Sequence, residues 1–287
     1  MHGTQEAMTQ GEAVRHWPWA VLAGLALSPS PANCEEAPDL LRDPLHVALG
    51  AFIINTDTTV RLDGNAGTQG TPVDWEQTFG EGDVNRFRID GYWRFAKRHK
   101  LRALIFDSSR SDSETFAEDV AWGDVVFPVD AKVNGEFKFS IYELAYEYAF
   151  LQRDHYELSA SLGMHYTELE AKLAATVTLP EQAITERVSD SASVGEPLPV
   201  IGLRGTWGLP HNLWVDASGQ FFSLSTGGYD GNLQDYKVAL VWQPKKWLGL
   251  GVGYDSFSIT VDVDRSRFNG KLDWAYQGPM VFYSASF

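Results

Sequence analysis

Apolar and polar residues alternate along most of the chain from Pro44 onward. Between positions 86 and 95, the odd positions carry Phe, Ile, Gly and Trp, while the even ones carry Arg, Asp and Tyr. The same alternation recurs at 156–166, 236–243 and 248–255. A period of two predicts β-strands, because successive side chains of a strand point to opposite faces.

The connections between the predicted strands are of two kinds, which alternate along the chain. Short connections lie at 97–100, 151–155, 209–212 and 244–247, and mostly longer polar ones lie at 62–83, 111–134, 171–196, 225–232 and 262–270. The strands between them centre near positions 51, 90, 105, 143, 161, 203, 218, 239, 254 and 280. Short turns on one side and longer loops on the other are typical of outer-membrane barrels. We therefore predict an all-β fold, a closed up-and-down antiparallel transmembrane β-barrel of about ten strands.

Aromatic residues at the strand ends support this prediction, because membrane barrels carry aromatic girdles at both interfaces. The predicted outward aromatics beside the short turns are Trp93, Phe95, Tyr148, Phe150, Tyr156, Trp207, Trp242, Trp247 and Phe287. Those near the opposite ends are Tyr166, Phe221, Tyr236, Tyr254, Trp274 and Tyr276.

Two strands fit the alternation poorly. Phe137, Phe139 and Ile141 have the opposite parity to Tyr142, Leu144, Tyr146 and Tyr148, and Trp274 and Tyr276 have the opposite parity to Val281 and Tyr283. Each change of parity implies either a β-bulge or an upper strand half that already lies outside the membrane.

The first residues form a targeting pattern. A weakly basic start at Arg15 and His16 precedes the apolar run "WPWAVLAGLAL" and the small-residue exit "SPSPA", which is the layout of a secretory signal peptide. We predict a signal peptide at 1–32, a short periplasmic segment at 33–43 and the barrel at 44–287, with Met1 or Met8 as the start. The single cysteine, Cys34, excludes an intrachain disulfide.

The last residues alternate as well, and Val281, Tyr283 and Phe287 share one face. This ending resembles the C-terminal signature of Gram-negative outer-membrane β-barrel proteins, the class of small OmpA/OmpW-like barrels. The resemblance implies an outer-membrane location, contact with outer-membrane lipid and lipopolysaccharide, and recognition of these three residues by the barrel-assembly machinery. It does not imply an activity, because such barrels host many functions.

The net charge of −15 argues against nucleic-acid binding, which needs a basic surface. Much of the excess acid lies in the predicted long loops, above all at Asp112, Glu114, Glu118, Asp119 and Asp124. Their oxygens suit a divalent cation that bridges to lipopolysaccharide phosphates. The simpler interpretation, solvated loops, is favoured because no ligand spacing of a known cation motif is present. We expect no bound metal and no cofactor.

The charged residues on the predicted inward face nearly balance, since five cations oppose six carboxylates. They are Arg88, Arg94, Arg102, Arg204 and Lys237 against Asp90, Glu143, Glu147, Glu157, Asp216 and Asp255. Buried charges persist only when paired and hydrogen-bonded. We therefore expect a salt-bridged plug in the lumen, centred near the short turns.

This pattern favours a non-enzymatic surface or integrity protein with a plugged or very narrow lumen. The alternatives are a hydrolase acting on lipid or peptide at the extracellular rim, a narrow gated channel, and a soluble ligand-binding barrel. Among the histidines only His165 lies well up a strand, and it forms no recognisable catalytic arrangement. No catalytic residue is predicted, and the oligomeric state cannot be read from the chain.

Overall fold

The computed structural model describes residues 38–52, 55–64, 67–80, 85–179, 184–226, 229–265 and 268–287. Its secondary structure is almost entirely strand. The elements are β1 (Leu45–Phe52), β2 (Asn55–Leu62), β3 (Val73–Asp74), α1 (Trp75–Phe79), β4 (Asn85–Ala96), β5 (His99–Thr115), β6 (Val120–Trp122), β7 (Val125–Phe127), β8 (Lys132–Gln152), β9 (Tyr156–Leu179), β10 (Ile184–Leu209), β11 (Leu213–Thr226), β12 (Tyr229–Lys245), β13 (Leu248–Arg265) and β14 (Phe268–Ser286).

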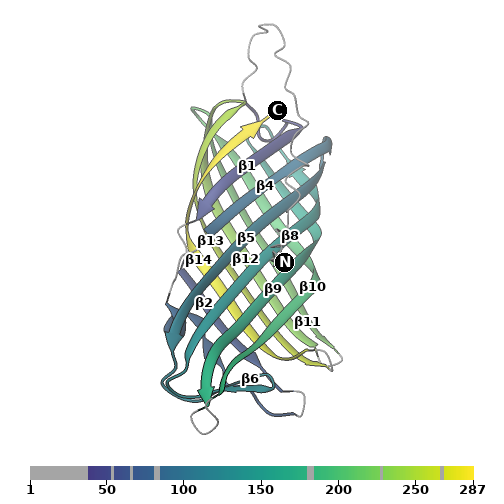
Figure 1. The fold of residues 1–287 in the computed structure, drawn as a ribbon. Helices are drawn as coiled ribbons and strands as arrows, with labels where there is room; N and C mark the ends of the chain where they lie inside the picture. The colour runs from purple at the N-terminus through teal and green to yellow at the C-terminus, as the bar shows by residue number, and fades with distance from the viewer. Residues whose placement is uncertain are drawn as a thin grey trace, which may run out of the picture. The chain divides into compact units, whose positions relative to one another are not determined.

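Neighbouring strands of the chain pair antiparallel around a closed barrel (Figure 1). The order is β1-β4-β5-β8-β9-β10-β11-β12-β13-β14, and β1 pairs again with β14 to close the wall. The closing pair is fixed at its end by reciprocal backbone hydrogen bonds between Leu45 and Phe287, of 3.1 and 2.8 Å. Within the described residues, with β2 as the continuation of β1, the wall has ten strands. The predicted fold class is confirmed.

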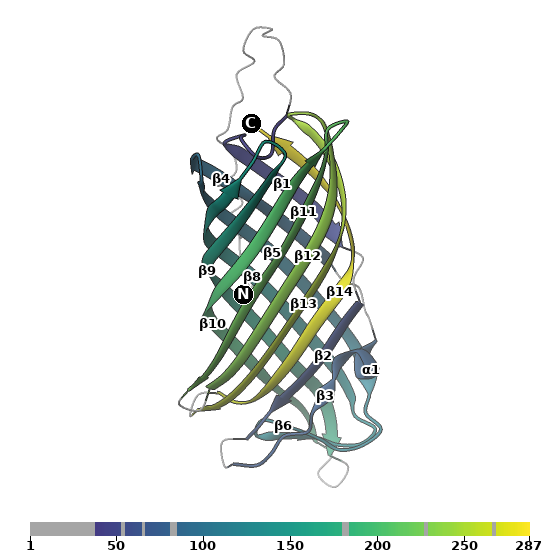
Figure 2. The same cartoon turned by 180° about the vertical axis from the view of Figure 1, so that it is seen from behind.

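The two kinds of connection lie at opposite ends of the barrel, as the view from behind also shows (Figure 2). The predicted short turns are confirmed. The predicted long loops are too long, because the strands extend into the ranges assigned to them. The range 171–196 is almost entirely strand, within β9 and β10. Small residues such as Ala171 and Ala192 continue the alternation there, with their side chains buried inside.

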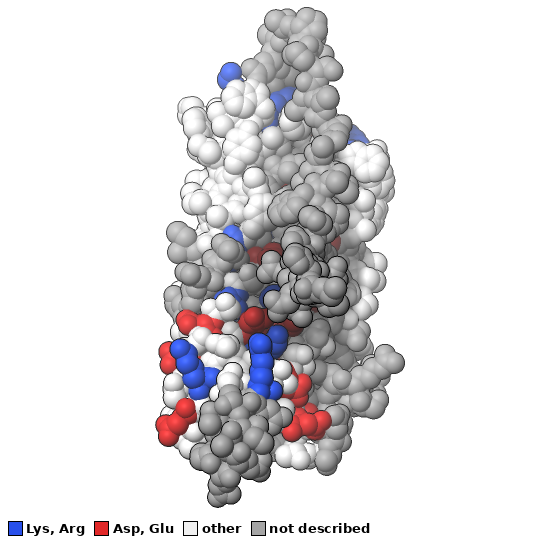
Figure 3. Space-filling model, viewed as in Figure 1, with Lys and Arg blue, Asp and Glu red and all other residues white. Residues whose placement is uncertain are grey.

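The half of the barrel near the short turns carries an apolar outer surface. Exposed Leu, Val, Ile and aromatic side chains cover it, and a band without charge is visible there in the space-filling view (Figure 3). We call this surface the belt. On β8 it runs from Tyr142 to Phe150, and on β10 from Ile201 to Leu209. Charged side chains gather on the other half of the surface.

Beyond the belt the two faces of each strand exchange their chemistry. Here the outer face is polar, and the inner face holds one large apolar core. Phe139 stacks on Trp274 with ring centroids 3.6 Å apart, and Tyr276 stacks on Phe106 and Phe257 at 5.3 and 5.4 Å. The residues that break the alternation in the two poorly fitting strands belong to this core.

The β-bulges that were one of the two explanations for these strands are absent at the predicted positions. The β5–β8 and β13–β14 ladders run without a register shift past Ile141 and Gly278. The parity is continuous, so Phe137, Phe139 and Ile141 point inward because the inner face has become apolar. For the same reason, the prediction that Trp274 and Tyr276 belong to the outer girdle is wrong, since both are buried in the core.

A lid covers the core at the long-loop end of the barrel. The β6–β7 hairpin buries Trp122 and Phe127 in the same core as the helix residues Trp75 and Phe79. Backbone hydrogen bonds hold the lid to the wall, from Gly123 N to Leu62 O at 2.9 Å. The short helix α1 is capped at its N-terminus by Asp74, whose side chain accepts a hydrogen bond from Gln77 N. No helix in the described part of the chain is long and apolar enough to cross a membrane.

We expect the Trp274→Ala substitution to destabilise the barrel by about 3–5 kcal/mol, because it empties the centre of the aromatic core. Trp247→Ala is the control, since Trp247 is 51% exposed on the outer surface. Urea unfolding in phospholipid vesicles, followed by far-UV circular dichroism, measures both. Equal effects of the two substitutions would contradict a core that carries much of the stability.

Candidate functional site

The charged residues predicted to fill the lumen lie inside the belt half of the barrel. All eleven are buried or half-buried, and each comes from an inward position of a wall strand. They are Arg88, Asp90 and Arg94 on β4, Arg102 on β5, Glu143 and Glu147 on β8, Glu157 on β9, Arg204 on β10, Asp216 on β11, Lys237 on β12 and Asp255 on β13. We call this set, together with Lys100, His165 and Gln220, the ionic layer.

Two glutamates organise the part of the ionic layer nearest the short turns. Glu157 pairs with Arg94 Nη1 at 2.8 Å and with Lys100 Nζ at 2.6 Å. Glu147 pairs with the same Lys100 Nζ, and with Arg102 Nε at 3.1 Å. Lys100 therefore bridges two carboxylates that come from different strands.

Lys100 is a functional residue that the sequence interpretation missed. It was assigned to the turn "KRHK", yet it is buried and shares the inward parity of Arg102. The signal was present in that parity. Adding Lys100 to the predicted inward residues gives six cations and six carboxylates. Tyr92 lies close to three of the cations, with Lys100 Nζ 5.3 Å from its ring centroid.

A second group of ion pairs lies deeper in the lumen. Asp90 pairs with Arg88 at 3.1 Å and with Lys237 at 3.3 Å. Arg88 reaches across to Asp255 at 2.6 Å, which joins β4 to β13. The predicted residues are thus paired across the barrel as well as along its wall.

His165 closes the layer towards the apolar core. Its Nε2 lies 2.8 Å from Gln220 Oε1 and 3.2 Å from Glu143 Oε2, and Gln220 Nε2 donates to Glu143 Oε1 at 2.7 Å. The ring is only 1% exposed. A substrate cannot approach this imidazole, so the arrangement is that of a packed polar node.

The N-terminal residues that the structure describes close the mouth on the short-turn side. Leu40 and Leu41 are buried, and they pack with Trp214, Val241 and Phe282. The carbonyl of Leu40 accepts a hydrogen bond of 2.6 Å from Tyr92 Oη, and that of Leu41 accepts one from Gln152 Nε2. The cavity between this segment and the ionic layer has a volume of only about 40 Å³.

Glu76 of α1 connects the helix to the wall beyond the belt. Its carboxylate accepts hydrogen bonds from Thr58 N at 2.7 Å and Thr58 Oγ1 at 3.0 Å, and it pairs with the Arg110 guanidinium. On this edge, within the part of the chain that the structure describes, β2 pairs with the two-residue strand β3 alone. A side chain therefore satisfies a strand amide that no neighbouring strand reaches.

The environment of Glu76 opposes its protonation. Partial burial of the carboxyl raises its pKa, but the Arg110 guanidinium and the threonine donors outweigh burial, so the pKa lies below its ordinary value.

The acidic residues proposed for cation binding are not gathered into one site. Asp112, Glu114 and Glu118 line a cleft of about 860 Å³ beside α1. Asp119 instead accepts a hydrogen bond from Val129 N, and Asp124 donates its amide to Asp190. Across the described residues, no group of three or more His, Cys, Asp or Glu is placed to hold a metal ion.

The three residues of the expected assembly signal lie on the outer surface of β14 and at the end of the chain. Val281, Tyr283 and Phe287 are exposed in the belt, and Tyr283 Oη donates to the carbonyl of Trp247. Their role in assembly stays a prediction.

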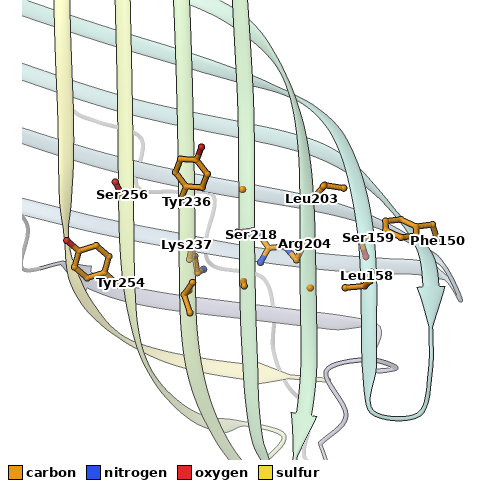
Figure 4. A pocket seen from close by; sticks show the side chains of 14 residues that line it. Phe150, Leu158, Ser159, Leu203, Arg204, Ser218, Tyr236, Lys237, Tyr254 and Ser256 are labelled. Carbon is orange, nitrogen blue, oxygen red and sulfur yellow. The ribbon is translucent and has the colours of Figure 1, made fainter.

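A hollow of about 430 Å³ opens in the outer wall over β9 to β13 (Figure 4). Gly205, Ala217 and Gly219 form its floor, because small residues meet there on the outward face. Phe150 and Tyr254 lie at its borders. The ladders beneath the hollow are continuous, so it is a depression in an intact wall.

No protein-family model matches the chain, and no curated protein matches it. Among solved structures, it is similar to the outer-membrane protease OmpT from Escherichia coli, with a TM-score of 0.56 and 10% identity, over 85% of this chain and 96% of that chain. It is also similar to Ail, the attachment invasion locus protein of Yersinia pestis, with a TM-score of 0.33 and 12% identity, over 85% and 99%. The toluene transporter TodX of Pseudomonas putida has a TM-score of 0.36 and 10% identity, over 88% and 91%. The likeness to OmpT and the closed ten-stranded wall of the described residues give the chain the fold of an outer-membrane β-barrel.

We expect Glu147→Gln to destabilise the protein by about 3–5 kcal/mol, because it leaves buried cations without their counter-charge. Glu170→Gln is the matched control, since Glu170 forms an exposed pair with Lys138 and should change stability by about 0–1 kcal/mol. Urea unfolding in vesicles measures both variants. A neutral effect of Glu147→Gln would show that the pairs contribute little.

Acidification should loosen α1 before it unfolds the barrel. Because the pKa of Glu76 is depressed, its stabilising contribution is complete above the ordinary carboxyl pKa and is lost as pH falls through the folded value. The protection of the Thr58 amide from hydrogen exchange, taken relative to the intrinsic exchange rate at each pH in detergent micelles, should fall in acid.

In the Glu76→Gln variant this amide should exchange rapidly already at neutral pH, whereas Glu118→Gln, in the exposed loop, should leave the wild-type profile unchanged. An unaltered pH profile in Glu76→Gln would exclude Glu76 as the titrating group.

Proposed function

We propose that this chain is an integral outer-membrane protein of a Gram-negative bacterium, with a non-enzymatic surface or integrity role and a lumen that does not conduct. The outer-membrane β-barrel fold is the premise. The non-conducting lumen rests on one observation, the filling of the interior by the ionic layer inside the belt.

The belt supports the membrane location. It is nine residues long on β8, from Tyr142 to Phe150, and on β10, from Ile201 to Leu209. A tilted strand needs about 9–11 residues to cross a bilayer. Charged residues at the same height point inward, where they pair, so that hydrocarbon meets only apolar side chains.

Three successive barriers support the absence of conduction. The Leu40–Leu41 turn occupies one mouth, the ionic layer crosses the lumen inside the belt, and the apolar core with its lid fills the other half. About 40 Å³ of free volume beside the ionic layer has room for only a few water molecules, since each needs roughly 10–15 Å³ on this measure. A gated channel would need several ion pairs to separate at once.

The part of the barrel beyond the belt supports a surface role. Its strands hold a rigid, polar outer face away from the membrane, because the apolar core braces them from inside. Outer-membrane lipid and lipopolysaccharide are the partners proposed for the belt and for the acidic residues between Asp112 and Asp124. The assembly machinery is the partner proposed for Val281, Tyr283 and Phe287.

Proteolysis, the activity named for the OmpT structure, is not part of the proposal. The likeness at 10% identity concerns the fold, and the best sequence candidate, His165, is enclosed by Glu143 and Gln220.

Planar-bilayer recordings test the lumen directly. The wild-type protein should show no steady single-channel current, because water and ions have no continuous path through the ionic layer. A stable open current at moderate voltage would overturn the proposal of a blocked lumen and favour the channel.

The membrane location has its own test. Purified protein should partition into lipid vesicles and should migrate differently on gels before and after heating, as folded membrane barrels do. Solubility of the folded chain without detergent would contradict the proposed location.

A further inference from the structure

The wall of the barrel is interrupted between β10 and β11. Their ladder ends at the pair Ile201 and Phe221, although both strands continue beyond it. On its other side β10 remains paired with β9 from Trp207 to Ile184. The separation therefore leaves one edge of β10 and the facing edge of β11 unpaired.

Two prolines encode this separation. The amide of Gly208 donates to His155 O on the β9 side, so even-numbered amides of β10 face β9 and odd-numbered ones face β11. Pro197 and Pro199 are odd-numbered, and proline has no N–H. The two donors that would extend the ladder to β11 beyond Ile201 are therefore missing.

A groove of about 660 Å³ occupies the gap. Its outer border is formed by belt residues, among them Leu162, Ile201 and Phe221. Phe222 and Leu233, which belong to the apolar core, form its floor. The groove therefore runs from the lipid-facing surface to the interior of the barrel without crossing a polar layer.

The groove lies at the edge of the belt that faces the long-loop end of the barrel. Tyr166 is the register partner of Pro197, and Tyr236 lies beside Phe221 with ring centroids 5.4 Å apart. Exposed tyrosines of this kind mark the level of lipid headgroups. An unpaired strand edge is tolerated there, whereas inside hydrocarbon it is not.

Polar groups gather toward the long-loop end of the groove. Ser223 and Asn232, which are register partners, line that end, and Gln234 lies closer to the belt, opposite Phe221. A molecule that fits must therefore be apolar along most of its length and polar at one end. A lipid has this chemistry. The belt side of the groove, at Leu162 and Ile201, is continuous with the surface proposed to contact lipid.

We propose that the groove between β10 and β11 binds one acyl chain of an outer-leaflet lipid, with the polar end of that lipid at Ser223 and Asn232. This inference rests on the proposed membrane location. The bound chain would contact the apolar core, so the lipid becomes part of the barrel wall at the point where the ladder is missing.

Photocrosslinking tests the site. The protein is reconstituted in vesicles of phosphatidylethanolamine and phosphatidylglycerol that contain a phospholipid with a diazirine near the carbonyl end of one acyl chain. Leu224 is the diagnostic residue, because its parity is inward and it is still 43% exposed beyond the end of the ladder. We expect labelling of Leu224 at a level similar to that of belt residues such as Tyr142.

Restoring the missing donors should close the groove. In the Pro197→Val/Pro199→Val double variant, labelling of Leu224 should fall by at least about fivefold, since two backbone hydrogen bonds can form with β11. Pro279→Val is the matched control, because Pro279 lies in a ladder that is already continuous. It should leave the labelling unchanged.

A second variant blocks the groove without altering the ladder. Ser223→Trp places a large side chain in the lining, and it should lower labelling of Leu224 to a similar extent. Ser225→Trp, two residues further along the same face and outside the lining, should not.

The outcomes separate this inference from the proposed function. Labelling of the belt without labelling of Leu224 would overturn the lipid site and leave the membrane location intact. Labelling of Leu224 that neither the double variant nor Ser223→Trp lowers would also overturn it. Absence of labelling over the whole belt would contradict the membrane location itself.

Discussion

A strand that passes from hydrocarbon into water keeps its period of two but must exchange the chemistry of its two faces. On β8, Tyr142 and Leu144 face outward while Glu143 and Glu147 point into the lumen. A few residues earlier, Phe139 points inward. The backbone ladder passes through this exchange without interruption. The rest of the architecture depends on it, because it decides where the barrel can hold charge and where it can hold an apolar core.

The two halves of the barrel interior are packed by different interactions. Inside the belt the inward residues can neither contact lipid nor reach bulk water easily, so their charges must neutralise one another. Lys100 does this with Glu147 and Glu157, which joins neighbouring strands of the wall. Beyond the belt the surroundings are aqueous, and the hydrophobic effect again favours an apolar interior. Each half is packed by the interaction that its surroundings permit.

Strand number, turn placement and inward charges could be predicted because they depend on local periodicity. The apolar core was missed for a related reason: Phe139 and Trp274 continue the period, but with the opposite hydrophobic sign. They were interpreted as a bulge, as girdle residues or as strand halves outside the membrane, and the last of these fits the continuous ladders. The contacts of Glu76 with Thr58 and Arg110 join segments that are distant in the sequence. No local pattern encodes them. The alternating prolines in "EPLPV" were visible in the sequence. Their meaning required knowledge of which neighbour each amide faces.

The backbone and the side chains mark the same boundary independently. In the described part of the wall, β10 separates from β11 beyond Ile201, and β4 begins only at Asn85, so that β2 is left with the carboxylate of Glu76 at its edge. Both interruptions lie at, or beyond, the edge of the belt that faces the long-loop end of the barrel. An unpaired edge inside hydrocarbon would leave amides without any partner, while at the headgroup level water, a side chain or a lipid can provide one. The ladder is therefore continuous where the membrane requires it and is interrupted only where another group can take its place.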